Sequence, residues 1–132
     1  EGKPGLLHLP GVIEVAGSES RSALATALYA PGREILTLLP GGRYDFASGD
    51  SISTAQVTGV VALLLAKNPG LSAGAAYRIL RDTSGRSDVD VGDSEHVNAC
   101  AAVVSLMGRG SCRTSNNDLQ LADKQEQRAA PH

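Results

Sequence analysis

Apolar and β-branched residues gather in short runs in the first half of the chain. Val12–Ala16 and Glu34–Leu39 have the length and composition of strands, and a glycine or proline follows each of them at once. Runs bounded by turn residues in this way are typical of β-strands. Small and polar residues over Gly17–Thr26 and a turn signal at Ala30–Gly32 predict loop structure between the two strands. Arg43–Ala47 is expected to form a short extended segment after the second strand.

After residue 50 the spacing of apolar residues becomes that of an α-helix. Hydrophobic residues recur at intervals of three and four positions and so share one helical face: Val57, Val60, Val61, Leu64 and Leu65. The remaining positions up to Ala66 are mostly Ala, Gly, Ser and Thr, which predicts a helix from near Ser51 that is almost fully buried. Asn68-Pro69-Gly70 is expected to stop it.

Two shorter helices are expected downstream. Ser72 has the position of an N-cap for an amphipathic helix that places Arg78 and Arg81 on its solvent-exposed face. Val97–Leu106 is rich in alanine and predicts a third helix that ends at a glycine. The polar, acidic segment Gly85–Asp93 predicts a loop between these two helices.

Composition narrows the fold class and the organisation of the chain. Aromatic residues make up only 3% of the chain and tryptophan is absent, so the core must rest on Val, Leu, Ile and Ala, as in α/β proteins. We expect a folded part over residues 1–108 and a polar, disordered tail over residues 109–132. The first residue is Glu1 and no signal segment precedes the body, which indicates a processed N-terminus or a fragment.

Charge and cysteine content exclude several classes of function. The net charge is −2 and no block of Lys or Arg occurs, so binding to nucleic acid or to an anionic membrane has no electrostatic support. The longest apolar run, Val60–Ala66, is too short to span a bilayer. Cys100 and Cys112 match no zinc-binding spacing, and they either form a disulfide in an oxidising compartment or stay free.

The candidate chemistry lies at the start of the long helix. Ser51 follows Gly49-Asp50 directly before the apolar helical pattern. A hydroxyl at a helix N-terminus is close to unpaired backbone N–H groups and to the positive end of the helix dipole. That location suits a nucleophile whose attack creates an oxyanion. The alternative is a serine that only caps the helix. Gly49 and Gly59 are expected to serve a tight turn and a close backbone contact.

The stretch Gly49–Gly59, which reads G-D-S-I-S-T-A-Q-V-T-G, resembles the nucleophile motif G-T-S-M-A-x-P-H-V-A-G of the subtilisin-like (S8) serine proteases. Further segments that resemble the C-terminal third of that catalytic domain occur in the family's order from Pro10 to Val104: Pro10–Gly17, Ala30–Leu36, Asn68–Ser72, Ile79–Ser84 and Val97–Ala99. Several weak segments in the right order are far more specific than a lone Gly-x-Ser.

The resemblance implies a fold and an activity. Residues 1–108 would be the C-terminal portion of a subtilisin-like three-layer α/β fold, with a parallel sheet and a central helix. The implied function is serine-type endopeptidase activity on peptide or protein substrates, with Ser51 as the nucleophile. No cofactor is needed and no metal site can be assigned. The family also implies a secreted or periplasmic location, and the upstream part of the same peptidase domain as a partner.

Two further consequences follow from the family's motifs. The triad order Asp, His, Ser places the acid and the base far upstream of the serine, so this chain carries one triad member of three. His8 stands where the family has no triad member and reads as a loop histidine. Asp50 replaces a threonine whose hydroxyl helps to hold the oxyanion, and a carboxylate there repels negative charge unless it points away or is neutralised. Gln56 replaces a helix histidine that is not catalytic.

Other interpretations of the same residues remain open. The chain could be a catalytically inactive protease remnant or a binding module. Gly49-Asp50-Ser51 together with Asp93-x-x-His96 also mimics the sequence blocks of GDSL/SGNH-type esterases, although only 45 residues separate Ser51 from His96. Asp45, together with Asp50, is expected to be a turn residue rather than half of a catalytic carboxylate pair.

Overall fold

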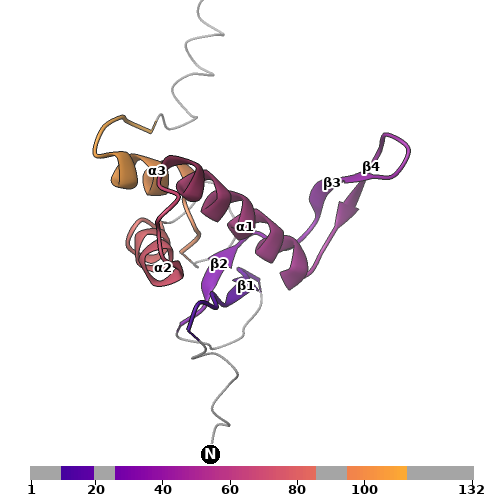
Figure 1. The fold of residues 1–132 in the computed structure, drawn as a ribbon. Coiled ribbons are helices and arrows are strands. Elements are labelled where there is room, and N and C mark those ends of the chain that lie inside the picture. The colour runs from indigo at the N-terminus through magenta and orange to yellow at the C-terminus, as the bar shows by residue number, and fades with distance from the viewer. Residues whose placement is uncertain (1–9, 20–25, 86–94, 113–132) are drawn as a thin grey trace, which may run out of the picture.

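A long helix, α1, runs through the middle of the molecule, and the other elements are arranged around it (Figure 1). The computed structural model describes residues 10–19, 26–85 and 95–112. Its elements, in chain order, are β1 (Val15–Gly17), β2 (Leu28–Ala30), β3 (Ile35–Leu39), β4 (Arg43–Ala47), α1 (Asp50–Lys67), α2 (Ala73–Asp82) and α3 (Ala99–Met107). His8, Asp93 and the predicted tail from residue 113 onward lie outside the described residues.

β1 and β2 form a two-stranded parallel sheet beneath the first half of α1. Val15 pairs with Leu28 and Gly17 with Ala30, which confirms the parallel pairing. β1 is shorter than predicted, because β2 offers pairing partners only from Leu28 onward. β2 itself was not predicted as a strand, and only its last residue, Ala30, falls within a predicted segment, the turn at Ala30–Gly32. β2 is only three residues long, and its pairing with β1 rather than any local pattern makes it a strand.

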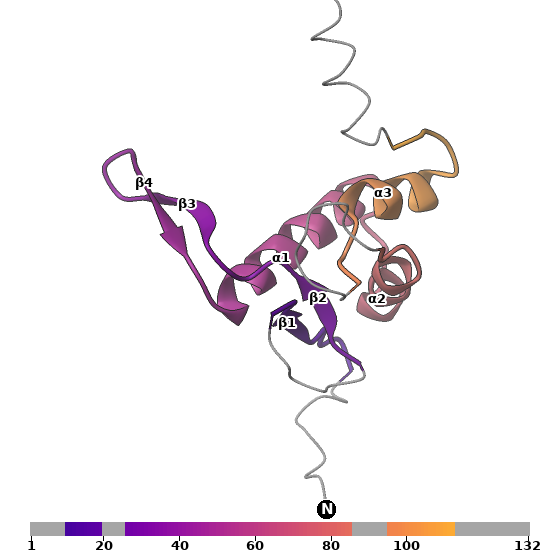
Figure 2. The same ribbon diagram turned by 180° about the vertical axis from the view of Figure 1, so that it is seen from behind.

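β3 and β4 form an antiparallel hairpin that projects from the body near the N-terminal end of α1 (Figures 1 and 2). Both segments are extended as predicted, and Gly41 and Gly42 close the turn with positive φ angles. One face of the hairpin carries four exposed apolar side chains in two cross-strand pairs: Leu36 with Phe46 and Leu38 with Tyr44.

α1 begins and ends as predicted, but its burial differs from the prediction. Ser53, Val57 and Leu64 are buried along one stripe, whereas Leu63 and Leu65 are 53% and 38% exposed. The expectation of an almost fully buried helix is therefore wrong for this chain. The physical reason is that the sheet, α2 and α3 pack against one side of α1 and leave the other side exposed.

Local signals account for the ends of the shorter helices. The Ser72 side chain accepts a hydrogen bond from the N–H of Ala75, as predicted for an N-cap, and Arg78 and Arg81 are exposed. Asn98 caps α3 in the same way, and Gly108 ends it in the left-handed conformation.

A disulfide joins Cys100 to Cys112. Of the two possibilities that the sequence left open, a disulfide or free cysteines, the structure therefore has the disulfide.

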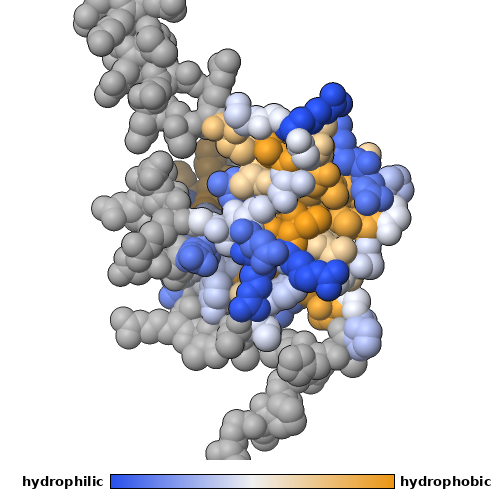
Figure 3. Space-filling view, turned by 90° about the vertical axis from the view of Figure 1, so that its left-hand side faces the viewer, coloured by the Kyte–Doolittle hydropathy of each residue, from blue (hydrophilic) through white to orange (hydrophobic). Residues whose placement is uncertain are grey.

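The core lies where α1, α2, α3 and β2 meet, and it is aliphatic as the composition predicts. Its buried members are Leu28, Ala30, Val57, Leu64, Ala76, Leu80 and Ala102. The view from the side of α2 and α3 also shows hydrophobic residues gathered at the surface, with hydrophilic residues around them (Figure 3). Within the described ranges, no helix is at once long and apolar enough to cross a bilayer.

Replacing Gly59 with alanine is expected to stabilise the 132-residue chain. Gly59 lies inside α1, and no described atom is within 4 Å of a Cβ built on it, so the close backbone contact expected from the sequence is absent among the described residues. Glycine costs a helix interior roughly 0.5–1 kcal/mol relative to alanine. Urea unfolding followed by circular dichroism should show a gain of about that size. A loss of stability would contradict the open surroundings of this position.

Candidate active site

The turn before α1 requires glycine. Gly49 precedes the helix as its N-cap with φ 141° and ψ 160°, a conformation that side chains disfavour, and no side chain caps the helix. The Gly49 N–H donates to the Gly32 carbonyl at 2.7 Å, and the Gly49 carbonyl accepts from the Ile52 N–H at 3.0 Å. The turn is therefore held on the segment that follows β2, and the tight turn expected at Gly49 is confirmed.

Ser51 is the second residue of α1 and is exposed. Its hydroxyl makes no hydrogen bond with any residue that the structure describes, so Ser51 does not cap the helix. Its backbone N–H belongs to the first helical turn, where N–H groups lack intrahelical acceptors and the helix dipole is positive. Ser51 thus combines an accessible hydroxyl with a local field that favours negative charge.

The Asp50 carboxylate is directed onto the end of β1. Its Oδ1 accepts a hydrogen bond from the Gly17 N–H at 2.8 Å in a partly buried position. A carboxylate in the first turn of a helix is also favoured by the helix dipole. The Gly17 N–H and the helix dipole therefore both stabilise the negative charge of Asp50.

Two more polar side chains attach α1 to the segment that follows β2. The fully buried Ser53 hydroxyl lies 3.0 Å from the Ala30 carbonyl and 3.2 Å from the Pro31 carbonyl, and can donate to either. Gln56 Nε2 donates to the Pro31 carbonyl at 2.6 Å. Sequence reasoning missed Ser53, because its partners lie more than twenty residues away along the chain.

Small residues allow these segments to approach one another. A Cβ built on Gly32 would lie 2.5 Å from Ser53 Oγ and 3.2 Å from both Gly17 Cα and the Gly49 carbonyl oxygen. The Gly32 N–H donates to the Glu19 carboxylate at 3.2 Å. The turn formed by Gly49, Asp50 and the candidate nucleophile Ser51, hereafter the nucleophile turn, is therefore packed backbone against backbone on the ends of β1 and β2.

The remaining candidate residues do not join Ser51. His96 is 5% exposed, and neither ring nitrogen has a hydrogen-bond partner among the described residues, so no hydrogen bond links it to Ser51. Its backbone pairs with Gly85 between α2 and α3. Asp45 lies within β4 rather than in a turn and accepts from the N–H of Phe46. No three His, Cys, Asp or Glu side chains come together as a metal-binding group in the described part of the chain.

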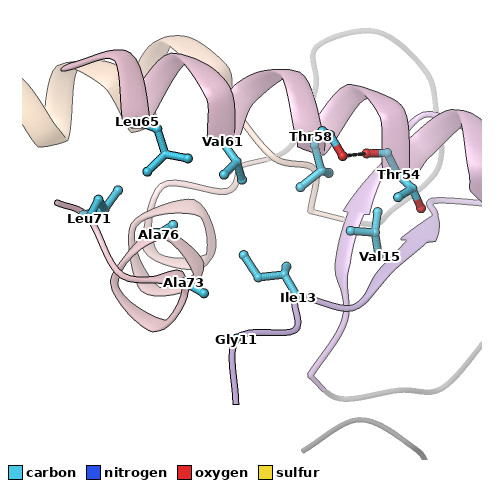
Figure 4. A pocket seen from close by; sticks show the side chains of 11 residues that line it. Gly11, Ile13, Val15, Thr54, Thr58, Val61, Leu65, Leu71, Ala73 and Ala76 are labelled. Atoms are coloured by element: carbon cyan, nitrogen blue, oxygen red, sulfur yellow. Dashed lines mark hydrogen bonds between the residues drawn. The ribbon is translucent and has the colours of Figure 1, made fainter. Parts of the chain in front are cut away.

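A groove of about 290 Å³ lies between α1, α2 and the segment that leads into β1 (Figure 4). Ile13, Val61 and Leu71 point into it, and among the described residues that line it Thr54 and Thr58 alone carry hydroxyl groups. The Thr58 hydroxyl donates to the Thr54 carbonyl at 2.8 Å. The groove is therefore an apolar surface along the side of the helix that begins at the candidate nucleophile.

Comparison with curated proteins gives consistent relatives. Subtilisin-like protease 1 of Trichophyton equinum is 35% identical over 115 residues, which cover 81% of this chain and 21% of that protein. Subtilisin-like protease SBT3.16 of Arabidopsis thaliana is 48% identical over 60 residues, which cover 45% of this chain and 8% of that protein. The chain thus spans at most about a fifth of the length of these relatives.

Comparison with solved structures supports the predicted α/β fold. Fervidolysin from Fervidobacterium pennivorans, a keratinolytic enzyme related to subtilisin, aligns with a TM-score of 0.54 at 25% identity over 80% of this chain and 20% of that chain. The model of the subtilase family matches residues 15–125. This match covers most of the chain and includes the Gly49-Asp50-Ser51 turn. The chain therefore belongs to the subtilase family.

Proposed function

We propose that this chain is the nucleophile-bearing part of a serine endopeptidase and that Ser51 Oγ is the attacking atom. The observation that carries the proposal is the Ser51 hydroxyl itself, which lies exposed in the first turn of α1 and makes no hydrogen bond with any described residue. The same serine lies in the stretch that resembles the family's nucleophile motif. Membership in the subtilase family supports hydrolysis of peptide bonds as the reaction.

The proposed chemistry is acyl transfer through a covalent intermediate. Ser51 Oγ attacks the scissile carbonyl carbon while a histidine base takes its proton, and the backbone N–H of Ser51 donates to the oxyanion that forms. The C–N bond breaks with proton transfer to the leaving amine, and water then hydrolyses the acyl-enzyme. The histidine, its orienting aspartate and the oxyanion asparagine come from outside this chain. No cofactor takes part.

We further propose that the upstream part of the same peptidase domain packs on the exposed side of α1. The exposed Leu63 on that side is a surface that a larger domain would bury, and the apolar groove on the side of α1 that faces α2 is a second such surface. Docking there would also reverse the effect of Gly59→Ala, since an added methyl group would meet the docked part. A secreted location is supported by the Cys100–Cys112 disulfide, and a periplasmic location is the alternative.

Labelling with a fluorophosphonate probe tests the proposed nucleophile. The polypeptide expressed from the complete gene is expected to be labelled at Ser51, and Ser51→Ala should abolish labelling. Ser105→Ala is the matched control, because Ser105 is an exposed helix serine outside the site, and it should leave labelling unchanged.

Each other outcome selects a competing interpretation. A folded polypeptide that is not labelled at Ser51 would favour an inactive remnant or a binding module. Labelling of the 132-residue chain alone, abolished by His96→Ala, would favour the GDSL/SGNH-type esterase. The buried imidazole of His96 weighs against this last outcome.

A further inference from the structure

We propose that Asp50 is a positioning residue, whose carboxylate fixes the nucleophile turn on β1 and thereby sets the place of Ser51. This inference rests on the proposed peptidase function. In the family's motif a threonine precedes the serine. The proposal gives the aspartate that replaces it in this chain a structural role. Asp50 then acts through the backbone and does not touch the substrate.

The geometry of β1 supplies the reason for a carboxylate. The Glu14 carbonyl accepts from Leu28 and the Ser18 N–H donates to Ala30, so alternate residues of β1 face β2. Gly17 lies between them in this alternation, and its N–H points to the opposite edge of the strand. Asp50 Oδ1 accepts from this N–H at 2.8 Å, a charge-assisted bond of the stronger kind.

The hydrogen bond between Asp50 and Gly17 is one of three contacts that hold the chain just before and just after Ser51. Before the serine, the Gly49 N–H is held by the Gly32 carbonyl at 2.7 Å, and after it the Ser53 hydroxyl is held by the Ala30 carbonyl at 3.0 Å. These two bonds lead to the β2 side of the sheet, whereas the Asp50 bond leads to β1. Because Gly49 offers no side chain to pack, Asp50 is the residue next to Ser51 that anchors the turn to this second strand.

Two substitutions separate the position of the acceptor from its charge. Asp50→Asn keeps an acceptor oxygen at the same distance from the backbone and removes the charge. Asp50→Glu keeps the charge but moves the carboxylate outward by one methylene. The readout is the second-order rate of fluorophosphonate labelling at Ser51 in the polypeptide expressed from the complete gene. In the 132-residue chain, the hydrogen-exchange rate of the Gly17 amide is measured, with the Ser18 amide as the internal control.

The positioning role predicts labelling within about threefold of wild type for Asp50→Asn. It predicts a loss of roughly tenfold or more for Asp50→Glu, since small misplacements of a reacting group have large effects on rate. The Gly17 amide should exchange faster in Asp50→Glu only, and the Ser18 amide should stay protected in both variants. Wild-type labelling by Asp50→Glu, or an unchanged Gly17 amide in that variant, would overturn the proposal. If wild type itself is not labelled, the peptidase function fails, and the exchange of Gly17 still decides whether Asp50 holds β1.

Discussion

Leu64→Ala is expected to lower the free energy of unfolding by about 3–5 kcal/mol, which is the range for truncating a fully buried leucine. Leu64 has 0% exposure and belongs to the cluster in which α1, α2, α3 and β2 meet. The loss combines the transfer free energy of the removed methyl groups with the cavity that remains. Three of the other six buried members are alanines, whose side chains are too short to refill the space.

Leu63→Ala is the matched control for this prediction. Leu63 is the preceding residue on the same helix and is 53% exposed, so its truncation should change the stability of the 132-residue chain by less than about 0.5 kcal/mol. Urea unfolding of both variants measures the difference. Equal losses for the two leucines would show that α1 is not oriented with Leu64 toward the core.

Gly32→Ala is expected to destabilise the chain by about 3 kcal/mol through overpacking. The new methyl carbon would lie 2.5 Å from Ser53 Oγ, whose two carbonyl neighbours keep it in place, and 3.2 Å from two backbone atoms. Neither the buried hydroxyl nor the backbone can yield without breaking the contacts that hold the start of α1. We therefore expect the nucleophile turn to shift together with the loss of stability.

Gly59→Ala provides the comparison for Gly32→Ala, since the same methyl group is added where nothing described lies within 4 Å. Denaturant unfolding should give opposite signs for the two variants. The amide signals of Gly17 and Gly49 in NMR spectra report the shift of the turn. A Gly32→Ala chain with wild-type stability would mean that the turn is not packed on the strand ends as described.

The sequence predicts the elements that carry strong local signals. α1 and α2 show clear helical spacing and recognisable start or stop residues, and the structure has them where the pattern predicts. β2 was missed because three residues beside a proline turn contain no periodic signal. Its strand character comes from β1, about thirteen residues earlier in the chain by register. Burial of α1 was overestimated, because small residues on a helix indicate that packing is possible there and not which partner supplies it.

In the candidate site, too, the sequence predicts the features that depend on neighbouring residues and misses those that depend on distant ones. The position of Ser51 at a helix N-terminus was predictable, since it depends on neighbours along the chain. The acceptor role of Asp50 toward Gly17 was not, because the two residues are 33 positions apart. Ser53 and Gln56 likewise find their partners in the segment after β2. A motif identifies a candidate nucleophile, whereas the contacts that hold it depend on which strands lie beside the helix.

The disulfide between Cys100 and Cys112 closes a covalent ring that includes α3 from its second residue onward and the exposed residues Arg109 and Gly110. Trypsin-like enzymes cleave after arginine, and Arg109 is exposed. If the backbone is cut there, the two products stay joined through the sulfur atoms until a reductant separates them. In a compartment that contains active peptidases, a single cut after α3 therefore breaks the backbone but does not release the C-terminal segment, because the disulfide still holds it.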